Sequence, residues 1–280
     1  MSHNSGSQAS LSHDRRALAD LADLFARIAI EAGALVLDLY DRGCGVARKA
    51  DASPVTEADT RAETLILERL ARELPGVAVV AEETVARAGA PRCPARFILV
   101  DPLDGTREFL QRNDEFTVNI ALIEDGAPVA GAVVAPAAGR LWTGGDGAHM
   151  ASVGRCEGVP RERRAIACRP APAALTALAS RSHGDERTEA FLARLPIAAR
   201  AGAGSSLKFC RIAEAAADVY PRFTPTMEWD TAAGQAVLAA AGGVVLTPDG
   251  APFRYGKCEE GYRNGPFVAW GDPAAPARFR

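Results

Sequence analysis

Asp101 and Asp104 are the residues of this 280-residue chain whose type and spacing point most directly to chemistry. They lie in DPLDGT (Asp101–Thr106), directly after the apolar run Phe97–Val100, which is typical of a buried strand. Two carboxylates that leave a strand end together offer the hard oxygen ligands that a divalent cation prefers. We also predict a helix start with Asp104 as its cap, where free backbone N–H groups could hold an anion. A strand, a proline turn and a capped helix would give the same pattern without any ligand.

Two further acidic residues strengthen the metal hypothesis. Glu82 follows the apolar segment Val77–Ala81, and Asp230 begins an alanine-rich helix. Carboxylates that share one pocket repel one another unless a cation lies between them, and oxygen-only ligation favours Mg²⁺ over Zn²⁺. We therefore expect Glu82, Asp101, Asp104 and Asp230 to bind two or three Mg²⁺ ions.

With such ions the chemistry would be phosphate ester hydrolysis. One metal would lower the pKa of a water molecule, and another would stabilise the leaving oxygen. Thr106 could orient that water, while the backbone N–H groups of Gly105 and Thr106 would hold phosphate oxygens. The spacing of Asp101 and Asp104 does not fit an aspartyl-phosphate mechanism, so we favour direct attack by the metal-bound water.

The composition excludes several other classes of protein. A formal net charge of −3 argues against a nucleic-acid polymer as partner. We find neither an apolar run long enough for a transmembrane segment nor a signal peptide. The six cysteines form no C-x-x-C pair, so a zinc site or a redox pair is not expected. We expect a cytoplasmic enzyme, and the oligomeric state is left open.

Hydrophobic periodicity predicts a layered α/β or α+β protein that can position these residues. We expect a long helix through Leu18–Leu39, a second helix opened by the capping box Thr56–Asp59, and a hairpin over residues 116–134. Ser205 and Ser206 are predicted to cap another helix. We divide the chain into a disordered tail (1–15), an N-terminal α+β subdomain with most metal ligands (16–150), and a C-terminal α/β subdomain (151–280). The segment from about Val153 to Pro172 would connect the two subdomains.

Several separated motifs resemble the inositol monophosphatase superfamily of magnesium-dependent, lithium-sensitive phosphatases, over about residues 18–270. The two main signatures are DPLDGT and MEWDTAAG (Met227–Gly234). Five further segments narrow the resemblance to its bacterial 3'(2'),5'-bisphosphate nucleotidase branch: TREFLQRNDEFTVNIA (Thr106–Ala121), GSSLKFC (Gly204–Cys210), YPRF (Tyr220–Phe223), DASPVTEAD (Asp51–Asp59) and SRSH (Ser180–His183). The sequence departs from the usual pattern in three places: at Ala81, at Arg107 and at the pair Met227–Glu228.

The resemblance implies an αβαβα sugar-phosphatase fold and a set of site residues. The metal ligands would be Glu82, Asp101, the Leu103 carbonyl, Asp104 and Asp230. Asp59 would support Thr106 and, with Glu82, the attacking water. The substrate would be a small phosphorylated nucleotide, 3'-phosphoadenosine 5'-phosphate, cleaved to AMP and phosphate. Peripheral association with the inner membrane is also implied.

The second phosphate of such a substrate needs a cradle of its own. We expect Ser205, Ser206 and Lys208 to provide it, near a helix start suited to anions. Lys208 could instead be a solvated charge, and Arg107, Arg112 or Arg181 could take this role. Two alternatives to the nucleotidase stay open: an inositol or other sugar monophosphatase on the same scaffold, and a non-catalytic phosphate-binding regulator. Retention of both Glu82 and Thr106 argues against the regulator.

Overall fold

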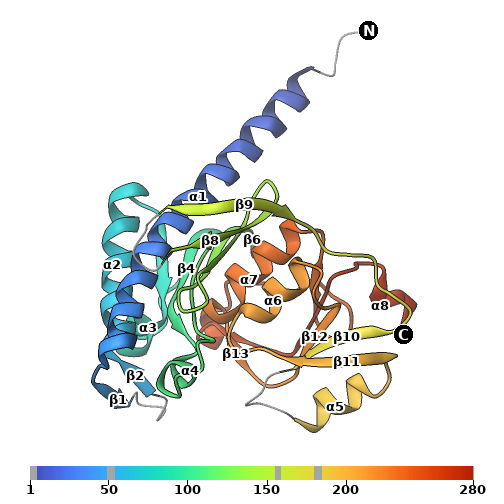
Figure 1. Cartoon of the computed structure of the whole chain (residues 1–280). Helices are drawn as coiled ribbons and strands as arrows, with labels where there is room; N and C mark the ends of the chain where they lie inside the picture. Colours follow the sequence, from blue (N-terminus) through green and yellow to red (C-terminus); the bar gives the residue numbers. More distant parts are fainter. Residues whose placement is uncertain (1–4, 49–53, 155–158, 180–184, 280) are drawn as a thin grey trace.

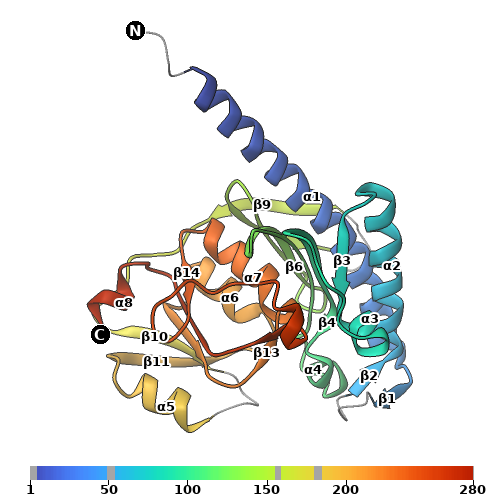
Figure 2. The same cartoon turned by 180° about the vertical axis from the view of Figure 1, so that it is seen from behind.

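The computed structural model describes residues 5–48, 54–154, 159–179 and 185–279, and these residues form five alternating layers of helix and sheet (Figure 1). Helices α1 and α2 cover one face of a seven-stranded sheet, and α7, with α6 packed beside it, covers the other face. A five-stranded sheet follows, with α5 and α8 on its far side (Figure 2). The predicted layered fold with αβαβα order is confirmed.

The seven-stranded sheet has the order β3-β4-β5-β6-β7-β8-β9, and all its neighbouring pairs are antiparallel except β3 with β4. Its strands are β3 (Ala78–Ala81), β4 (Arg96–Asp104), β5 (Thr117–Glu124), β6 (Ala127–Ala135), β7 (Arg140–Gly144), β8 (Ala148–Val153) and β9 (Pro160–Ile166). The five-stranded sheet has the order β11-β10-β12-β16-β14. Its strands are β10 (Leu175–Ala179), β11 (Ile197–Gly202), β12 (Val219–Arg222), β14 (Val244–Leu246) and β16 (Phe267–Trp270).

The helices and the smaller elements complete the fold. The helices are α1 (Ser5–Arg42), α2 (Glu57–Glu73), α3 (Glu82–Ala88), α4 (Thr106–Leu110), α5 (Glu186–Leu192), α6 (Leu207–Ala213), α7 (Trp229–Ala240) and α8 (Ala275–Arg278), with a 3₁₀ turn over Cys258–Glu260. Two short antiparallel ribbons pair β1 (Val46–Arg48) with β2 (Pro54–Thr56) and β13 (Thr226–Met227) with β15 (Arg263–Asn264). No helix in the described part of the chain is both long and apolar enough to cross a membrane.

Burial on both faces explains the uninterrupted apolar run in β4. Phe97 and Leu99 contribute to the core between the two sheets, whereas Ile98 and Val100 contribute to the core beneath α1 and α2. A strand that is covered on both sides has no polar face, so its sequence does not alternate.

At Gly144, helix α7 lies against the seven-stranded sheet with no side chain of the strand in between. A Cβ atom on Gly144 of β7 would lie only 2.4 Å from the carbonyl oxygen of Ala236, which is closer than such atoms approach in real structures. Glycine at this position therefore allows the backbone of β7 and the backbone of α7 to pack in direct contact. This packing fixes the first turn of α7, and with it Asp230, relative to β4 and β5.

The predicted boundaries need three corrections. Residues 5–15 belong to α1 and residues 1–4 lie outside the described part; the segment 5–15 contains no Pro, the residue that interrupts a helix most strongly. The boundary at 150/151 falls inside β8, and the expected connector near Val153 contains β9, because the seven-stranded sheet continues to Ile166.

Candidate active site

One cavity of about 290 Å³ brings most of the predicted site residues together. Its walls come from the ends of β4 and β12, the starts of α3, α4, α6 and α7, and the loop before α6. The lining residues are Pro54, Glu82, Asp104, Gly105, Thr106, Arg107, Glu108, Gly204, Ser205, Lys208, Phe209, Tyr220, Arg222, Thr226, Asp230 and Thr231. The other predicted site residues, Asp59, Asp101, Leu103 and Ser206, are buried beside it. The motif segments 51–53 and 180–183, including Arg181, lie outside the described residues.

A β-bulge in β4 shapes the DPLDGT segment. Asp101 pairs with Asn119 and Asp104 pairs with Thr117, so β4 carries one more residue than β5 over this stretch. The backbone N–H of Leu103 donates to the Asp101 carboxylate at 3.0 Å, which keeps the bulge in place. Gly105 then turns the chain into α4 with a φ of 93°, a left-handed conformation that glycine adopts without strain.

The prediction that Asp104 caps a helix is wrong. Asp104 is the last residue of β4, and Gly105 occupies the cap position of α4. The Asp104 carboxylate instead accepts hydrogen bonds from the Ser205 hydroxyl at 2.6 Å and from the Ser206 backbone N–H at 2.7 Å, both through Oδ2. Asp104 therefore joins the two halves of the chain, and Oδ1 is its candidate ligand atom.

Thr106 is hydrogen-bonded to a carboxylate that a capping box holds rigidly. The Thr106 hydroxyl lies 3.1 Å from Asp59 Oδ1 and 3.3 Å from the Leu103 carbonyl oxygen. The other Asp59 oxygen accepts both the backbone N–H and the hydroxyl of Thr56, at 2.7 and 2.6 Å. Asp59 is fully buried, so its orientation is fixed before any substrate arrives. The contact that the resemblance implies is present, and its catalytic role stays a prediction.

Glu82 begins α3, and a second glutamate holds that helix start. Glu63 of α2 accepts the backbone N–H of Glu83 and the hydroxyl of Thr84, both at 2.7 Å. Sequence reasoning missed Glu63. The available signal was a carboxylate on the buried stripe that also carries Ala62 and Ile66.

The electrostatics of the cavity fit a bound cation. Burial raises the pKa of Asp230 well above its usual value, and the neighbouring Asp104 and Glu82 carboxylates raise it further. Burial also raises the pKa of Asp104. In the described residues no three His, Cys, Asp or Glu side chains converge closely enough to enclose an ion. Mg²⁺ commonly uses only one or two carboxylates and takes its remaining oxygens from water and substrate phosphate, so this donor set fits it.

The predicted phosphate cradle is largely engaged in protein contacts. Lys208 is only 4% exposed, and its ammonium donates to the carbonyl oxygens of Ala203 at 3.0 Å and Ser205 at 2.7 Å. Burial lowers the Lys208 pKa to about 8. Ser206 donates to Asn119 at 2.8 Å, and no serine hydroxyl caps α6. These groups brace the loop that binds Asp104, because Lys208 satisfies two carbonyl oxygens of that loop and Ser206 ties it to β5.

Arg222 is a cavity residue that the sequence did not single out. It ends β12, is half-buried, and donates from Nε to the Thr224 carbonyl oxygen at a long 3.3 Å. Arg107 also lines the cavity, whereas Arg112 lies over the ring of Tyr40 at 4.6 Å and does not. The YPRF motif contains Arg222, and its position at a strand end was the available signal.

Comparisons with known proteins agree with this geometry. The model of the inositol monophosphatase family matches residues 18–270. The 3'(2'),5'-bisphosphate nucleotidase CysQ of Escherichia coli K12 is 43% identical over 237 residues, which cover 84% of this chain and 94% of that protein. The crystal structure of CysQ from Bacteroides thetaiotaomicron superposes with a TM-score of 0.75 at 37% identity and covers 90% of this chain and 97% of that one. An inositol monophosphatase from Anabaena shares the fold, with a TM-score of 0.70 at 23% identity and 92% of each chain covered. The chain therefore belongs to the inositol monophosphatase family.

Proposed function

We propose that the protein is a Mg²⁺-dependent 3'(2'),5'-bisphosphate nucleotidase that converts 3'-phosphoadenosine 5'-phosphate into AMP and phosphate. The observation that carries this proposal is a single cavity lined by both acidic groups and a cation: Glu82, Asp104 and Asp230 together with Arg222. The acidic groups suit a metal-bound reacting phosphate, and the guanidinium suits a second phosphate. The CysQ relatives, whose names state this activity, support the choice of substrate.

The metal would be held by Glu82, Asp101, the Leu103 carbonyl, Asp104 and Asp230. When bound, Mg²⁺ supplies Lewis-acid activation of water and neutralises charge on the phosphoryl group. We propose two or three ions. The buried positions of Asp101 and Leu103, at the bulge of β4, support a role for them at the base of the site.

The protein groups around the reacting phosphate would orient it and handle one proton. The backbone N–H groups of Gly105 and Thr106 would donate to its oxygens. Because the Thr106 hydroxyl donates its own proton to Asp59, its oxygen lone pairs are available to accept a hydrogen from the attacking water. Asp59, with Glu82 across the cavity, would hold that arrangement in place through the reaction.

The second phosphate would bind Arg222, with Ser205 and the remaining N–H of Lys208 as secondary contacts. Arg222 is a better candidate for this role than Lys208, because two protein carbonyl groups already accept from the Lys208 ammonium. Binding energy gained at this remote phosphate would orient the reacting one.

Phosphate release from 3'-phosphoadenosine 5'-phosphate and from inositol 1-phosphate, each with Mg²⁺, tests the proposal. We expect a clear preference for the bisphosphate and, as in the family, inhibition by Li⁺. A preference for inositol 1-phosphate would favour the sugar monophosphatase alternative. Absence of hydrolysis of either substrate, with retained binding of phosphate compounds, would favour the regulator. A cytoplasmic location and association with a membrane remain predictions.

A further inference from the structure

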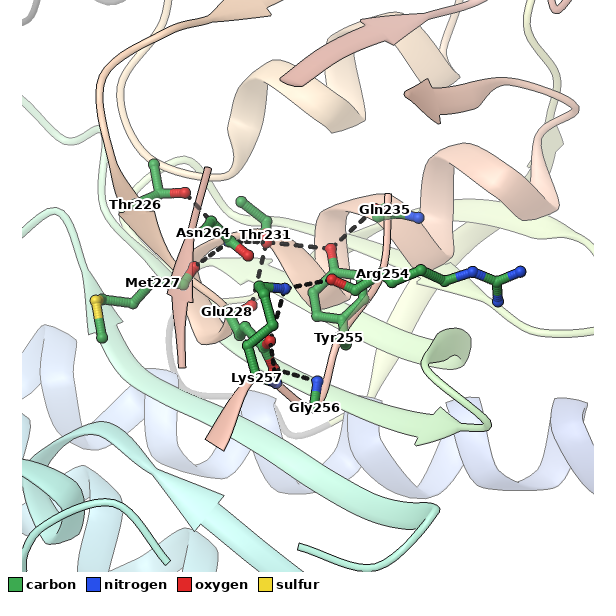
Figure 3. A network of polar contacts seen from close by, with 10 residues as sticks. All are labelled: Thr226, Met227, Glu228, Thr231, Gln235, Arg254, Tyr255, Gly256, Lys257 and Asn264. Atoms are coloured by element: carbon green, nitrogen blue, oxygen red, sulfur yellow. Dashed lines mark hydrogen bonds and ion pairs between the residues drawn. The ribbon is translucent and has the colours of Figure 1, made fainter. Parts of the chain in front are cut away.

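Glu228 is a buried charged residue that the proposed chemistry does not use. It precedes α7 by one position, its side chain is fully buried, and it does not line the active-site cavity. Figure 3 shows it at the centre of a polar network that joins the 226–231 and 254–257 segments. A fully buried carboxylate is costly unless its partners compensate it, so this network needs an explanation.

Both oxygens of Glu228 are occupied by the backbone of the 256–257 segment. The Gly256 N–H donates to Oε2 at 2.8 Å, and the Lys257 N–H donates to Oε1 at 2.9 Å. The Lys257 ammonium adds an ion pair to Oε1 at 2.7 Å and also donates to the Arg254 carbonyl oxygen (Figure 3). A carboxylate offers two acceptor oxygens, whereas an amide offers only one. Two backbone donors therefore require a carboxylate at this position.

The main chain around Glu228 is held equally firmly and leads directly to Asp230. The Glu228 N–H donates to the Tyr262 carbonyl oxygen at 2.9 Å. The neighbouring Met227 N–H donates to Asp230 Oδ2 at 2.8 Å, and the Met227 carbonyl oxygen accepts from the Asn264 amide at 2.8 Å. The turn that carries the Asp230 carboxylate is thus fixed on one side by the Glu228 side chain and on the other by Asn264.

We infer that Glu228 is a positioning residue for Asp230, an inference that rests on the proposed function. By fixing the 227–230 turn against the 256–257 backbone, Glu228 sets where Asp230 presents Oδ1 to a divalent cation. Asp230 binds the cation, and Glu228 acts through the turn without contacting it. Residues that orient a metal ligand in this way typically contribute roughly 10- to 100-fold to metal affinity.

The test is calorimetric titration of Mg²⁺ into the metal-free full-length protein. Glu228→Gln keeps the side-chain volume but replaces one acceptor oxygen with a donor, so one backbone N–H bond and the ion pair are lost. We expect its Kd for Mg²⁺ to rise by about tenfold or more. The Mg²⁺ concentration for half-maximal activity should rise in parallel, while kcat at saturating Mg²⁺ recovers towards the wild-type value.

Asp218→Asn is the matched control. Asp218 is also a buried carboxylate; it accepts from the Arg169 guanidinium and from the Thr176 backbone N–H at 2.7 Å, and it is not a cavity residue. Its variant should lose thermal stability to a degree comparable with Glu228→Gln but keep the wild-type Kd for Mg²⁺. A purely structural role of Glu228 would make the two variants behave alike.

The outcomes separate this inference from the proposed function. Wild-type protein that binds no Mg²⁺ would overturn the proposed function. Wild-type protein that binds Mg²⁺, with an unchanged Kd in folded Glu228→Gln, would overturn only the positioning role. If Glu228→Gln does not fold, Glu228→Asp decides, because it keeps the charge but shortens the side chain, so the carboxylate can no longer reach both backbone N–H groups of the 256–257 segment. A weakened Kd in Glu228→Asp supports the inference, and a wild-type Kd overturns it.

Discussion

Replacement of Arg222 by alanine should separate bisphosphate from monophosphate substrates. The guanidinium is half-buried at the cavity wall; it donates from Nε to the Thr224 carbonyl oxygen at a long 3.3 Å and also contacts the Tyr220 hydroxyl, which leaves several of its five N–H groups without a protein acceptor of their own. Most of its donors could therefore turn to a phosphate. Two charge-assisted hydrogen bonds at about 1.5 kcal/mol each, the lower end of the range because of partial exposure, amount to roughly 3 kcal/mol. That corresponds to a fall of about 100-fold in kcat/KM for 3'-phosphoadenosine 5'-phosphate.

The assay compares kcat/KM for that substrate and for inositol 1-phosphate at saturating Mg²⁺. Inositol 1-phosphate has no second phosphate, so its hydrolysis should change little. Arg222→Lys should lie between wild type and Arg222→Ala, since it keeps the charge but loses the planar fork. Arg211→Ala removes an equal charge from an exposed position outside the cavity and should affect neither substrate. Equal losses on both substrates in Arg222→Ala would refute the assignment of Arg222 to the second phosphate.

Three further predictions concern the remaining parts of the site. Thr106→Ala should fold normally and lower kcat by roughly 100-fold or more; an unchanged kcat would leave Thr106 a structural residue. In EDTA, the melting temperature should fall as the pH rises above about 4, because the raised Asp230 pKa makes the folded state bind more protons than the unfolded chain, whose Asp titrates near 3.8. Added Mg²⁺ should suppress this fall, and scanning calorimetry of wild type and Asp230→Asn over pH 5–8 checks whether Asp230 causes it. Lys208→Met should reduce kcat/KM for both substrates, because Lys208 braces the loop at Asp104, and the loss should be only slightly larger for the bisphosphate, whose second phosphate it contacts secondarily. A loss confined to the bisphosphate would instead make Lys208 the main ligand of the second phosphate.

Local patterns in the sequence were sufficient to predict much of the fold. The capping box Thr56–Asp59 was visible because all its donors and acceptors lie within four consecutive residues, and the structure contains it. The apolar run Phe97–Val100 predicted a buried strand from four consecutive residues, and the structure shows β4 buried on both faces. The length of helix α1 was underestimated because its first turns, which are rich in serine, have no apolar stripe and little helix propensity.

Long-range partners were the part that local patterns could not supply. Asp104 accepts from Ser205, 101 residues further along the chain, and this contact decides that Asp104 is not a helix cap. The acceptors of Lys208 are close in sequence, Ala203 and Ser205, but a side chain–backbone contact of this kind depends on which carbonyl groups the folded loop turns towards the ammonium, and residue types do not reveal that. Arg222 lines the cavity and Glu63 binds the start of α3, and in both cases the neighbouring groups are distant in sequence. Only the assembled fold therefore reveals these contacts.

The contact of α7 with Gly144 has a consequence for synthesis of the protein on the ribosome. The seven-stranded sheet is complete in sequence at Ile166, yet the helix that covers its second face ends at Ala240. Domains that form during translation do so once their last packing partner has left the exit tunnel. Until then one apolar face of the sheet stays uncovered in the nascent chain. A chaperone could bind this face during that stage of synthesis. The catalytic cavity, which needs Asp230, forms only when most of the polypeptide has emerged.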